Sequence, residues 1–256
     1  MQKNKDILHL AVFAGEILIK NGGEISRAES TMRHIIESYD IKDYHVYVLS
    51  NGIFANIESE NSHCCLIRHV AFGGVNLERI AAVNQLSREI CSLHYTPKTA
   101  LKKMESCQKL QNHSIWERSF GSGSGCAAFT LLFGGNILDC LFALCFGSTI
   151  QPFLFYCQKK KLSRPFYSIA TSAYITLLTI LAHILSIPIH VDMVTIGCIT
   201  PLLPGLTLTN SIRDFFNGDY LSGVIHMIEA LLTALCIATG VGFIITLYHS
   251  LGGSPL

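Results

Sequence analysis

Long apolar runs dominate the chain after residue 118. A helix needs about 20 mostly apolar residues to cross a hydrocarbon core of about 30 Å. Five segments are long enough or nearly so, namely 120–135, 137–157, 168–185, 194–216 and 223–248. The pattern therefore predicts an all-α transmembrane bundle of about five helices within residues 116–256.

Helical periodicity marks three stretches before this region. Apolar positions within residues 6–20 recur at helical spacing, which predicts a helix with one buried face. Ser26 and Glu29 match the S-x-x-E capping box and predict that a second helix begins at Ser26. Residues 76–93 return to a helical pattern after a stretch of different periodicity.

That intervening stretch alternates with a period of two. Residues 44–49 and 53–57 flank the dipeptide Asn51–Gly52, a favoured two-residue turn, so we expect a β-hairpin there. Residues 64–70 predict a third strand. The order helix, helix, strands, helix is typical of an α+β fold, so we expect residues 1–115 to form an α+β soluble N-terminal domain ahead of the membrane helices.

The distribution of charged residues supports the division into an N-terminal domain and a membrane region. Residues 1–118 hold 14 of the 19 Lys and Arg and 13 of the 18 Asp and Glu, which leaves five of each sign for residues 119–256. The formal net charge is only +1, so the sequence lacks the broad basic surface that nucleic acid requires, and no nucleic-acid partner is expected. Ten cysteines lie outside any C-x-x-C pair, and no disulfide framework, metal or cofactor is expected.

Basic residues occur in alternate connections between the apolar segments. They are Lys102, Lys103, Lys109 and Arg118 before the first segment, Lys159 to Lys161 and Arg164 after the second, and Arg213 after the fourth. The connections at 134–136 and 186–192 carry no Lys or Arg. The positive-inside rule then predicts a multi-pass membrane protein with a cytoplasmic N-terminal domain. We expect it in the plasma (inner) membrane.

The fourth segment contains residues that break helices. Pro201, Pro204 and Gly205 lie near its centre and remove backbone hydrogen bonds, so a break is expected. A half-helix that begins after Pro204 would direct free N–H groups and its positive dipole end toward an anion, while free carbonyls before the break can hold a cation. The alternative is a kinked helix whose break is satisfied by neighbouring helices.

Polar residues follow this break. Thr207, Asn210 and Asp214 share one helix face at spacings of three and four, with Arg213 beside them. The alternative for Arg213 and Asp214 is an interfacial ion pair at the cytoplasmic helix end. The candidate substrate-binding residues are Pro204, Gly205, Thr207, Thr209, Asn210 and Arg213.

Ionisable residues within apolar segments are costly unless they face protein or water, so they are candidates for proton coupling. Asp139 lies about one turn into the second segment, and His226 and Glu229 are three residues apart on the fifth. We take Asp139, Asp214 and Glu229 as proton-coupling candidates. The alternatives are an interfacial position for Asp139 and a structural hydrogen bond from Glu229.

Other motifs give weaker signals. The glycine and serine run at residues 121–125 contains G-x-x-x-G, which allows close helix contact, and it lacks the Gly-Lys-Ser/Thr of a phosphate loop. His63, Cys64, Cys65 and His69 lack zinc-site spacing, since adjacent cysteines on a strand point to opposite faces.

Three pieces of the chain resemble the threonine/serine exporter (ThrE) family. They are residues 22–29 (GGEISRAE), 204–214 (PGLTLTNSIRD) and 218–223 (GDYLSG). The resemblance implies a cytoplasmic domain followed by five spans, and export of threonine and serine driven by the proton motive force. Fused members of the family carry a second five-helix half that is absent from this sequence.

The same resemblance implies the larger subunit of a split, two-component form, for which the exported substrate is succinate. Its expected partner is a small YjjB-like membrane subunit with about five helices, and we expect an oligomer. Our leading hypothesis is a subunit of a proton-coupled secondary exporter that moves small carboxylate-bearing metabolites out of the cytoplasm. The alternative is a membrane-anchored hydrolase or regulatory module that acts through the soluble domain.

Overall fold

The computed structural model describes residues 2–59, 62–71, 73–110, 113–160 and 162–253. Internal contacts divide the chain into two compact units. The first, called here the N-terminal unit, comprises Met1–Gln111 and Leu206–Ile228, and the second, called the helical unit, comprises Asn112–Gly205 and Glu229–Leu256. The domain boundary expected near residue 116 stays a prediction, and Lys161, used above to orient the chain, lies outside the described residues.

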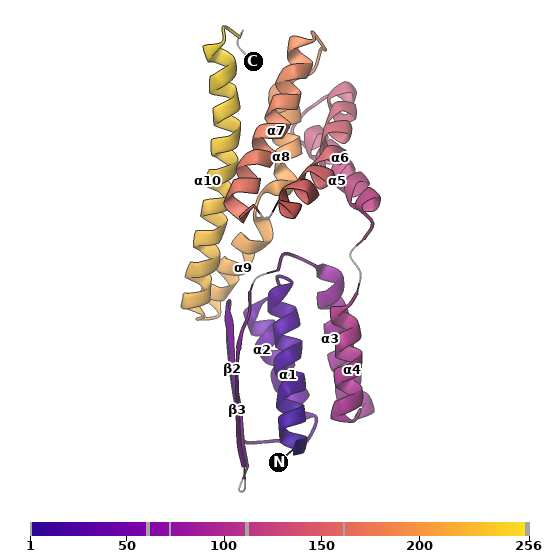
Figure 1. The fold of residues 1–256 in the computed structure, drawn as a ribbon, viewed down its shortest axis with the longest axis vertical. Helices are drawn as coiled ribbons and strands as arrows, with labels where there is room; N and C mark the ends of the chain where they lie inside the picture. The colour runs from indigo at the N-terminus through magenta and orange to yellow at the C-terminus, as the bar shows by residue number, and fades with distance from the viewer. Residues whose placement is uncertain (1, 60–61, 72, 111–112, 161, 254–256) are drawn as a thin grey trace. The chain divides into compact units, whose positions relative to one another are not determined.

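The N-terminal unit combines helices with a small sheet (Figure 1). Its elements are α1 (Gln2–Lys20), α2 (Ile25–Glu37), β1 (Tyr44–Leu49), β2 (Gly52–Ser59), β3 (Ser62–His69), α3 (Leu77–Leu93) and α4 (Pro97–Gln108). It also takes most of α9 (Gly205–Phe216) and the first turns of α10 (Tyr220–Ser250).

The centre of the N-terminal unit is α1, which lies between the sheet and α3 and α4 (Figure 1). The prediction that it buries a single face is wrong, because Leu10, Ala14 and Ile17 are buried as well as the predicted stripe. The reason is tertiary: α2, α3, α4, β2 and β3 all pack on α1, so nearly its whole circumference is covered. A helix covered in this way acts as the core of the unit.

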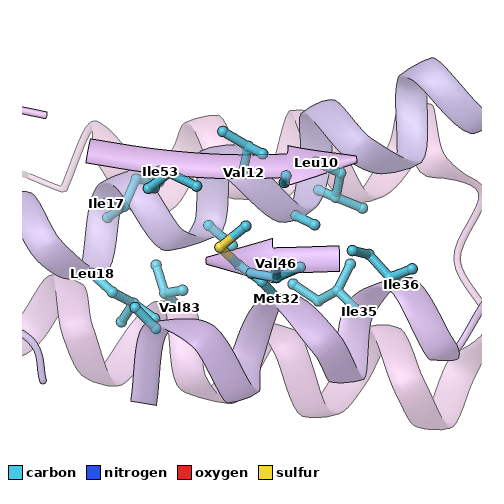
Figure 2. Packing of buried hydrophobic residues seen from close by; sticks show 14 of the residues in the cluster. Leu10, Val12, Ile17, Leu18, Met32, Ile35, Ile36, Val46, Ile53 and Val83 are labelled. Carbon is cyan, nitrogen blue, oxygen red and sulfur yellow. The ribbon is translucent and has the colours of Figure 1, made fainter. Parts of the chain in front are cut away.

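The surrounding elements supply the rest of this core. Figure 2 shows side chains from α2, β1, β2 and α3 converging on those of α1. The contributing residues include Met32, Ile35, Ile36, Val46, Ile53 and Val83. Full burial of an aliphatic side chain of this size contributes about 1.5–3 kcal/mol, so the cluster is the main source of stability for the unit.

A glycine turn ends α1. Gly22 has φ +83°, and the N–H groups of Gly22 and Gly23 donate to the carbonyls of Ile19 and Leu18 at 3.0 and 2.8 Å. This pair of bonds is a Schellman motif, for which glycine is favoured because it has no Cβ. The chain therefore reverses within a few residues and presents Glu24 at the start of α2.

The predicted capping box of α2 is not formed. The helix begins at Ile25 with Glu24 at the N-cap, so Ser26 lies inside the first turn. The Glu29 side chain instead accepts a bond of 2.5 Å from Arg33 one turn later. The tight glycine turn lets the helix restart earlier than the local pattern indicates.

The three strands form one antiparallel sheet in the order β1-β2-β3. The predicted hairpin and third strand are confirmed, but the turn differs from the prediction. Ser50 and Asn51 form the two-residue connection, while Gly52 is already the first residue of β2 and pairs with Leu49. The predicted helix at 76–93 is also confirmed as α3, with the Asn76 side chain capping its N-terminus.

The helical unit holds the apolar helices and the rest of α10. Its other elements are α5 (Ile115–Leu132), α6 (Ile137–Lys159), α7 (Arg164–Ile184), α8 (Val191–Ile199) and the 3₁₀ turn η1 (Thr200–Leu202). By length and composition, α6, α7 and α10 are three candidate membrane spans among the described residues. They overlap the predicted segments 137–157, 168–185 and 223–248.

The number of candidate spans is smaller than the five expected. The described helices give three, or four if α8 and η1 count with α9 as one broken span. The predicted first span, 120–135, lies largely in α5, which is not apolar enough to count as a candidate span. The charged residues Glu117 and Arg118 and the glycine and serine run lower the mean hydropathy of α5. The break in the fourth predicted segment is present, since η1 ends at Leu202 and α9 begins at Gly205.

Glycines allow α5 to contact α6 and α8 almost backbone to backbone. A Cβ on Gly123 would lie 2.6 Å from the Leu144 carbonyl oxygen of α6. A Cβ on Gly197 of α8 would lie 2.8 Å from the backbone nitrogen of Thr130 of α5. The close helix contact predicted for the glycine and serine run is thus confirmed, but a different glycine makes it. Gly121 and Gly125 of the G-x-x-x-G pair face open space, and Gly123 lies in the contact.

We expect Gly123→Ala to lower the free energy of unfolding by about 1–3 kcal/mol, because the added methyl group overlaps Leu144 and Ser148 in a packed interface. The matched control is Gly125→Ala on the same helix, where the methyl group meets open space and helix propensity favours alanine by about 1 kcal/mol. Thermal unfolding in detergent would compare the two. Equal melting temperatures would contradict the close contact.

Candidate functional site

In the N-terminal unit, α9 contacts the turn between α1 and α2. The Asn210 side-chain amide donates to the Gly22 carbonyl at 3.2 Å. About one helical turn further along α9, the Arg213 guanidinium forms an ion pair with the Glu24 carboxylate. Two stretches singled out in the sequence, 22–29 and 204–214, therefore meet in space although they are far apart in the chain.

Two guanidinium groups share the Glu24 carboxylate. Besides Arg213, the Arg27 guanidinium lies 3.6 Å from Glu24. The Arg27 and Arg213 side chains are 48% and 46% exposed, while that of Glu24 is 21% exposed. Ion pairs with this much solvent access contribute about 0–1 kcal/mol, so the contact can open at low cost.

Behind this ion pair lies a buried acid and base pair. The Asp214 carboxylate lies 2.9 Å from Nδ1 of His226, and the two side chains are 1% and 10% exposed. The Ser211 hydroxyl donates to the Gly223 carbonyl at 2.7 Å and ties α9 to the first turns of α10. A carboxylate buried to this degree needs a partner, and the imidazole supplies it.

The Asp219 carboxylate lies close to Asp214, in the connection between α9 and α10. Burial, together with the negative charges of Asp214 and Glu29, raises the pKa of Asp219 above its ordinary value. Carboxylates from α2, α9 and this connection thus converge in one region of the N-terminal unit.

A small hollow separates α9 from the glycine turn. Its lining includes Gly22, Gly23, Thr207, Asn210 and His226, and its volume is about 10 Å³. That space is enough for about one water molecule and too small for an amino acid. The structure therefore describes a closed arrangement at this point.

Four of the predicted site residues come together in this region, namely Thr207, Asn210, Arg213 and Asp214. Thr209 is exposed on another side of α9. Pro204 and Gly205 lie at the helix break, where Gly205 begins α9 and has open space around its Cα.

The predicted proton-coupling residue Asp139 is fully buried in the helical unit, at the start of α6. Its carboxylate accepts the backbone N–H of Asn136 at 2.8 Å and that of His190 at 2.9 Å, and lies 2.8 Å from the His190 ring. The bond and the charge of Asp139 raise the pKa of His190, which caps α8. Asp139 thus joins the N-terminal ends of α6 and α8.

The third proton-coupling candidate, Glu229, has a cation as its partner. Its carboxylate accepts a bond of 2.6 Å from Arg164 at the start of α7. His226, three residues earlier, bonds to Asp214 instead. These two residues of the fifth predicted segment therefore take separate partners, His226 in the N-terminal unit and Glu229 in the helical unit.

Sequence patterns did not reveal several of these partners. Glu24 lies in a stretch interpreted as a turn and helix start, and its pairing with Arg213 depends on tertiary contact. His190 and Arg164 lie in connections, where periodicity carries no information. The sequence does contain one signal for Glu24, which is its position directly after the two glycines. A glycine turn that ends a helix fixes the direction of the next residue, so a charged residue there is a candidate for a defined contact.

A row of buried hydroxyl groups on α7 was also missed. Thr171, Ser172, Thr176 and Thr179 are buried, and each donates to a carbonyl of its own helix. The Thr179 hydroxyl also bonds that of Thr195 on α8 at 2.8 Å. Small polar residues of this kind hold apolar helices together.

Comparison with known proteins assigns this chain to a family. The model of the family described as "Putative threonine/serine exporter" (ThrE) matches residues 9–248. The chain belongs to the threonine/serine exporter family. Since the matched range includes both stretches that meet at Glu24 and Arg213, the candidate site lies within the part common to the family. Family membership and the candidate spans indicate a membrane protein.

A curated relative agrees with the family. The threonine/serine exporter of Corynebacterium glutamicum is 26% identical over 244 residues, which cover 92% of this chain. The same alignment covers 50% of the relative, so this exporter-family chain spans about half the length of the curated protein it matches. No solved structure matches the chain.

The bond between Asp139 and His190 predicts a pH-dependent stability. Because the pKa of His190 is raised in the fold, the charged pair stabilises fully below the ordinary value of about 6.5, and this stabilisation is lost as pH rises through the higher folded value. We expect His190→Gln to lower the melting temperature most below pH 6.5 and progressively less above it.

The measurement is thermal unfolding of the detergent-solubilised chain across this pH range. The control is His249→Gln, which changes an exposed imidazole of α10. A His190→Gln effect of constant size at every pH would contradict an ionic contribution from the pair.

Proposed function

We propose that the chain is the larger subunit of a two-component, proton-coupled secondary exporter that moves threonine and serine out of the cytoplasm. The ion pair between Glu24 and Arg213 carries the proposal. The N-terminal unit contains both charges, and we place residues 1–111 on the cytoplasmic side of the inner membrane, as the basic connections predict.

An amino acid is chemically complementary to this ion pair when it opens. Its α-carboxylate can replace Glu24 on the Arg213 guanidinium, which offers a fork of donors suited to a carboxylate. Its α-ammonium can replace the guanidinium on Glu24. A zwitterion thus restores both charge interactions, and the exchange costs little because both side chains of the pair are partly exposed to solvent.

Succinate, the other substrate class considered, fits this site less well. One of its carboxylates can bind Arg213, but the same site then brings its negative charges next to Glu24, where like charges repel. The geometry therefore favours amino acids over dicarboxylates. Thr207 and Asn210 line the small hollow and lie on the same helix as Arg213, and they offer a hydroxyl and an amide for the side-chain hydroxyl of threonine or serine.

Among the three proton-coupling candidates, Asp214 is the one adjacent to the proposed substrate site. It follows Arg213 directly in α9 and bonds His226. Asp139 accepts bonds from two backbone N–H groups and an imidazole, and Glu229 is paired with Arg164, so both have structural roles that need no proton exchange. We propose that Asp214, with His226, exchanges the proton that drives export.

A partner completes the transporter in this proposal. The chain corresponds to about half of its curated relative, and its described helices provide three or four candidate spans. We propose that a small YjjB-like membrane subunit with about five helices supplies the remaining part and that the two assemble as an oligomer. Exposed apolar residues along α10 provide surface for lipid or for this subunit.

The substrate assignment predicts different effects of two substitutions. We expect Glu24→Gln to reduce threonine export at least tenfold, because the ammonium group loses its counterion, and to leave or improve any succinate export. We expect Arg213→Gln to reduce export of both, because both substrates carry a carboxylate. Efflux from cells that contain the chain and its partner subunit, loaded with each substrate, would measure these effects.

Lys103→Gln on α4 is the control, since it removes another basic side chain of the N-terminal unit, which pairs with Glu89 of α3. Wild-type threonine export in both Glu24→Gln and Arg213→Gln, at equal protein levels, would refute the site. Export of succinate alone by the wild type would refute the amino-acid assignment.

The proton assignment predicts a separation of two transport modes. We expect Asp214→Asn to abolish export driven by a proton gradient while it retains exchange of labelled for unlabelled threonine, since exchange needs no net proton movement. Vesicles that contain both subunits allow both measurements. Asp192→Asn, which removes an exposed carboxylate of α8, is the control. Gradient-driven export at the normal rate in Asp214→Asn would exclude this residue as the proton carrier.

A further inference from the structure

A polar groove lies between α2 and α3 of the N-terminal unit, apart from the small hollow beside α9. Its volume is about 650 Å³, within the range of small-molecule sites. Three potentially cationic side chains line it, and hydroxyl groups lie among them. These residues are Arg27, His34 and Arg88, with Ser30, Ser87 and Ser92.

The described lining of the groove carries more positive than negative charge. No Asp or Glu is among the described residues that line it. Arg88 forms no ion pair with any carboxylate that the structure describes, and Arg27 reaches Glu24 only at 3.6 Å. Burial and the negative charge of Glu37 raise the pKa of the Cys91 thiol in the same wall.

Hydrogen-bonding groups are available in both walls. The hydroxyls of Ser30, Ser87 and Ser92 already donate to carbonyls of their own helices. The donors available to an anion are therefore the guanidinium groups and the Asn84 amide, which has two N–H bonds. Guanidinium groups from both helices, together with an imidazole and an amide in the same lining, match a ligand that bears more than one anionic group.

We propose that this groove binds a small organic polyanion, through carboxylate or phosphate groups held between Arg27 and Arg88. The position of the groove allows a bound ligand to affect the proposed transport site through Arg27. Arg27 lines the groove and also approaches Glu24, which pairs with Arg213.

An anion on Arg27 competes with Glu24 for that guanidinium and leaves the Glu24 carboxylate to Arg213 alone. The ion pair that closes the proposed substrate site is thereby strengthened, so the bound polyanion acts as an inhibitor of export. This regulatory consequence rests on the proposed function, whereas binding in the groove does not.

The test is isothermal titration calorimetry on the purified full chain in detergent at constant ionic strength. The probes are citrate, succinate, inorganic phosphate and pyrophosphate, which separate carboxylate from phosphate ligands and one anionic group from several. We expect saturable binding of at least one multivalent probe and a dissociation constant raised about tenfold or more in Arg88→Gln, equivalent to about 1.4 kcal/mol. Arg33→Gln, which alters an arginine of α2 outside the groove lining, should change it less than about twofold.

Absence of saturable binding for every probe up to about 10 mM, or equal affinity in Arg88→Gln and wild type, would overturn the proposal. Arg88 is exposed, so its replacement leaves the core intact, and a melting curve of Arg88→Gln confirms that the variant is folded. Glu24→Gln separates the two proposals, because it should lose threonine export but keep calorimetric binding in the groove.

Discussion

The complete burial of α1 is the constraint on which the N-terminal unit depends. A helix with apolar residues on nearly every side needs covering elements all round it, and α2, α3, α4 and the sheet supply them. Where α1 ends, Gly22 and Gly23 turn the chain so sharply that the next residue, Glu24, is presented to α9. The position of the charge proposed to hold the substrate ammonium is therefore set by the packing of an apolar helix.

Much of the local structure follows from the sequence. The Asn76 cap, the hairpin and the apolar lengths of α6, α7 and α10 each depend on residues within one turn or one strand pair. The errors arise where distant residues decide. Ser26 has the right neighbours for a cap, but the preceding glycine turn starts α2 earlier. Gly121 and Gly125 have the right spacing for helix contact, but only Gly123 points toward α6.

The candidate site was predictable in part for the same reason. Thr207, Asn210 and Asp214 lie on one helix face, which spacing alone reveals. Their partners lie elsewhere in the chain. Glu24 is separated from Arg213 by most of the sequence, and no periodicity connects the two. Ionisable groups in apolar helices could be identified, but whether each meets a cation, an imidazole or a backbone amide is decided by tertiary packing.

The glycine contacts of α5 fix the spacing of the helices around it. Gly123 brings α5 against α6, and Thr130 receives Gly197 of α8, with no side chain between the backbones to absorb a displacement. Asp139 and His190 fasten the ends of α6 and α8 to each other. The Thr179 hydroxyl bonds that of Thr195 and attaches α7 to α8 as well. Packing this close leaves α5, α6 and α8 little freedom to change their separation, so a larger residue at Gly123 or Gly197 would have to displace a helix backbone rather than a side chain.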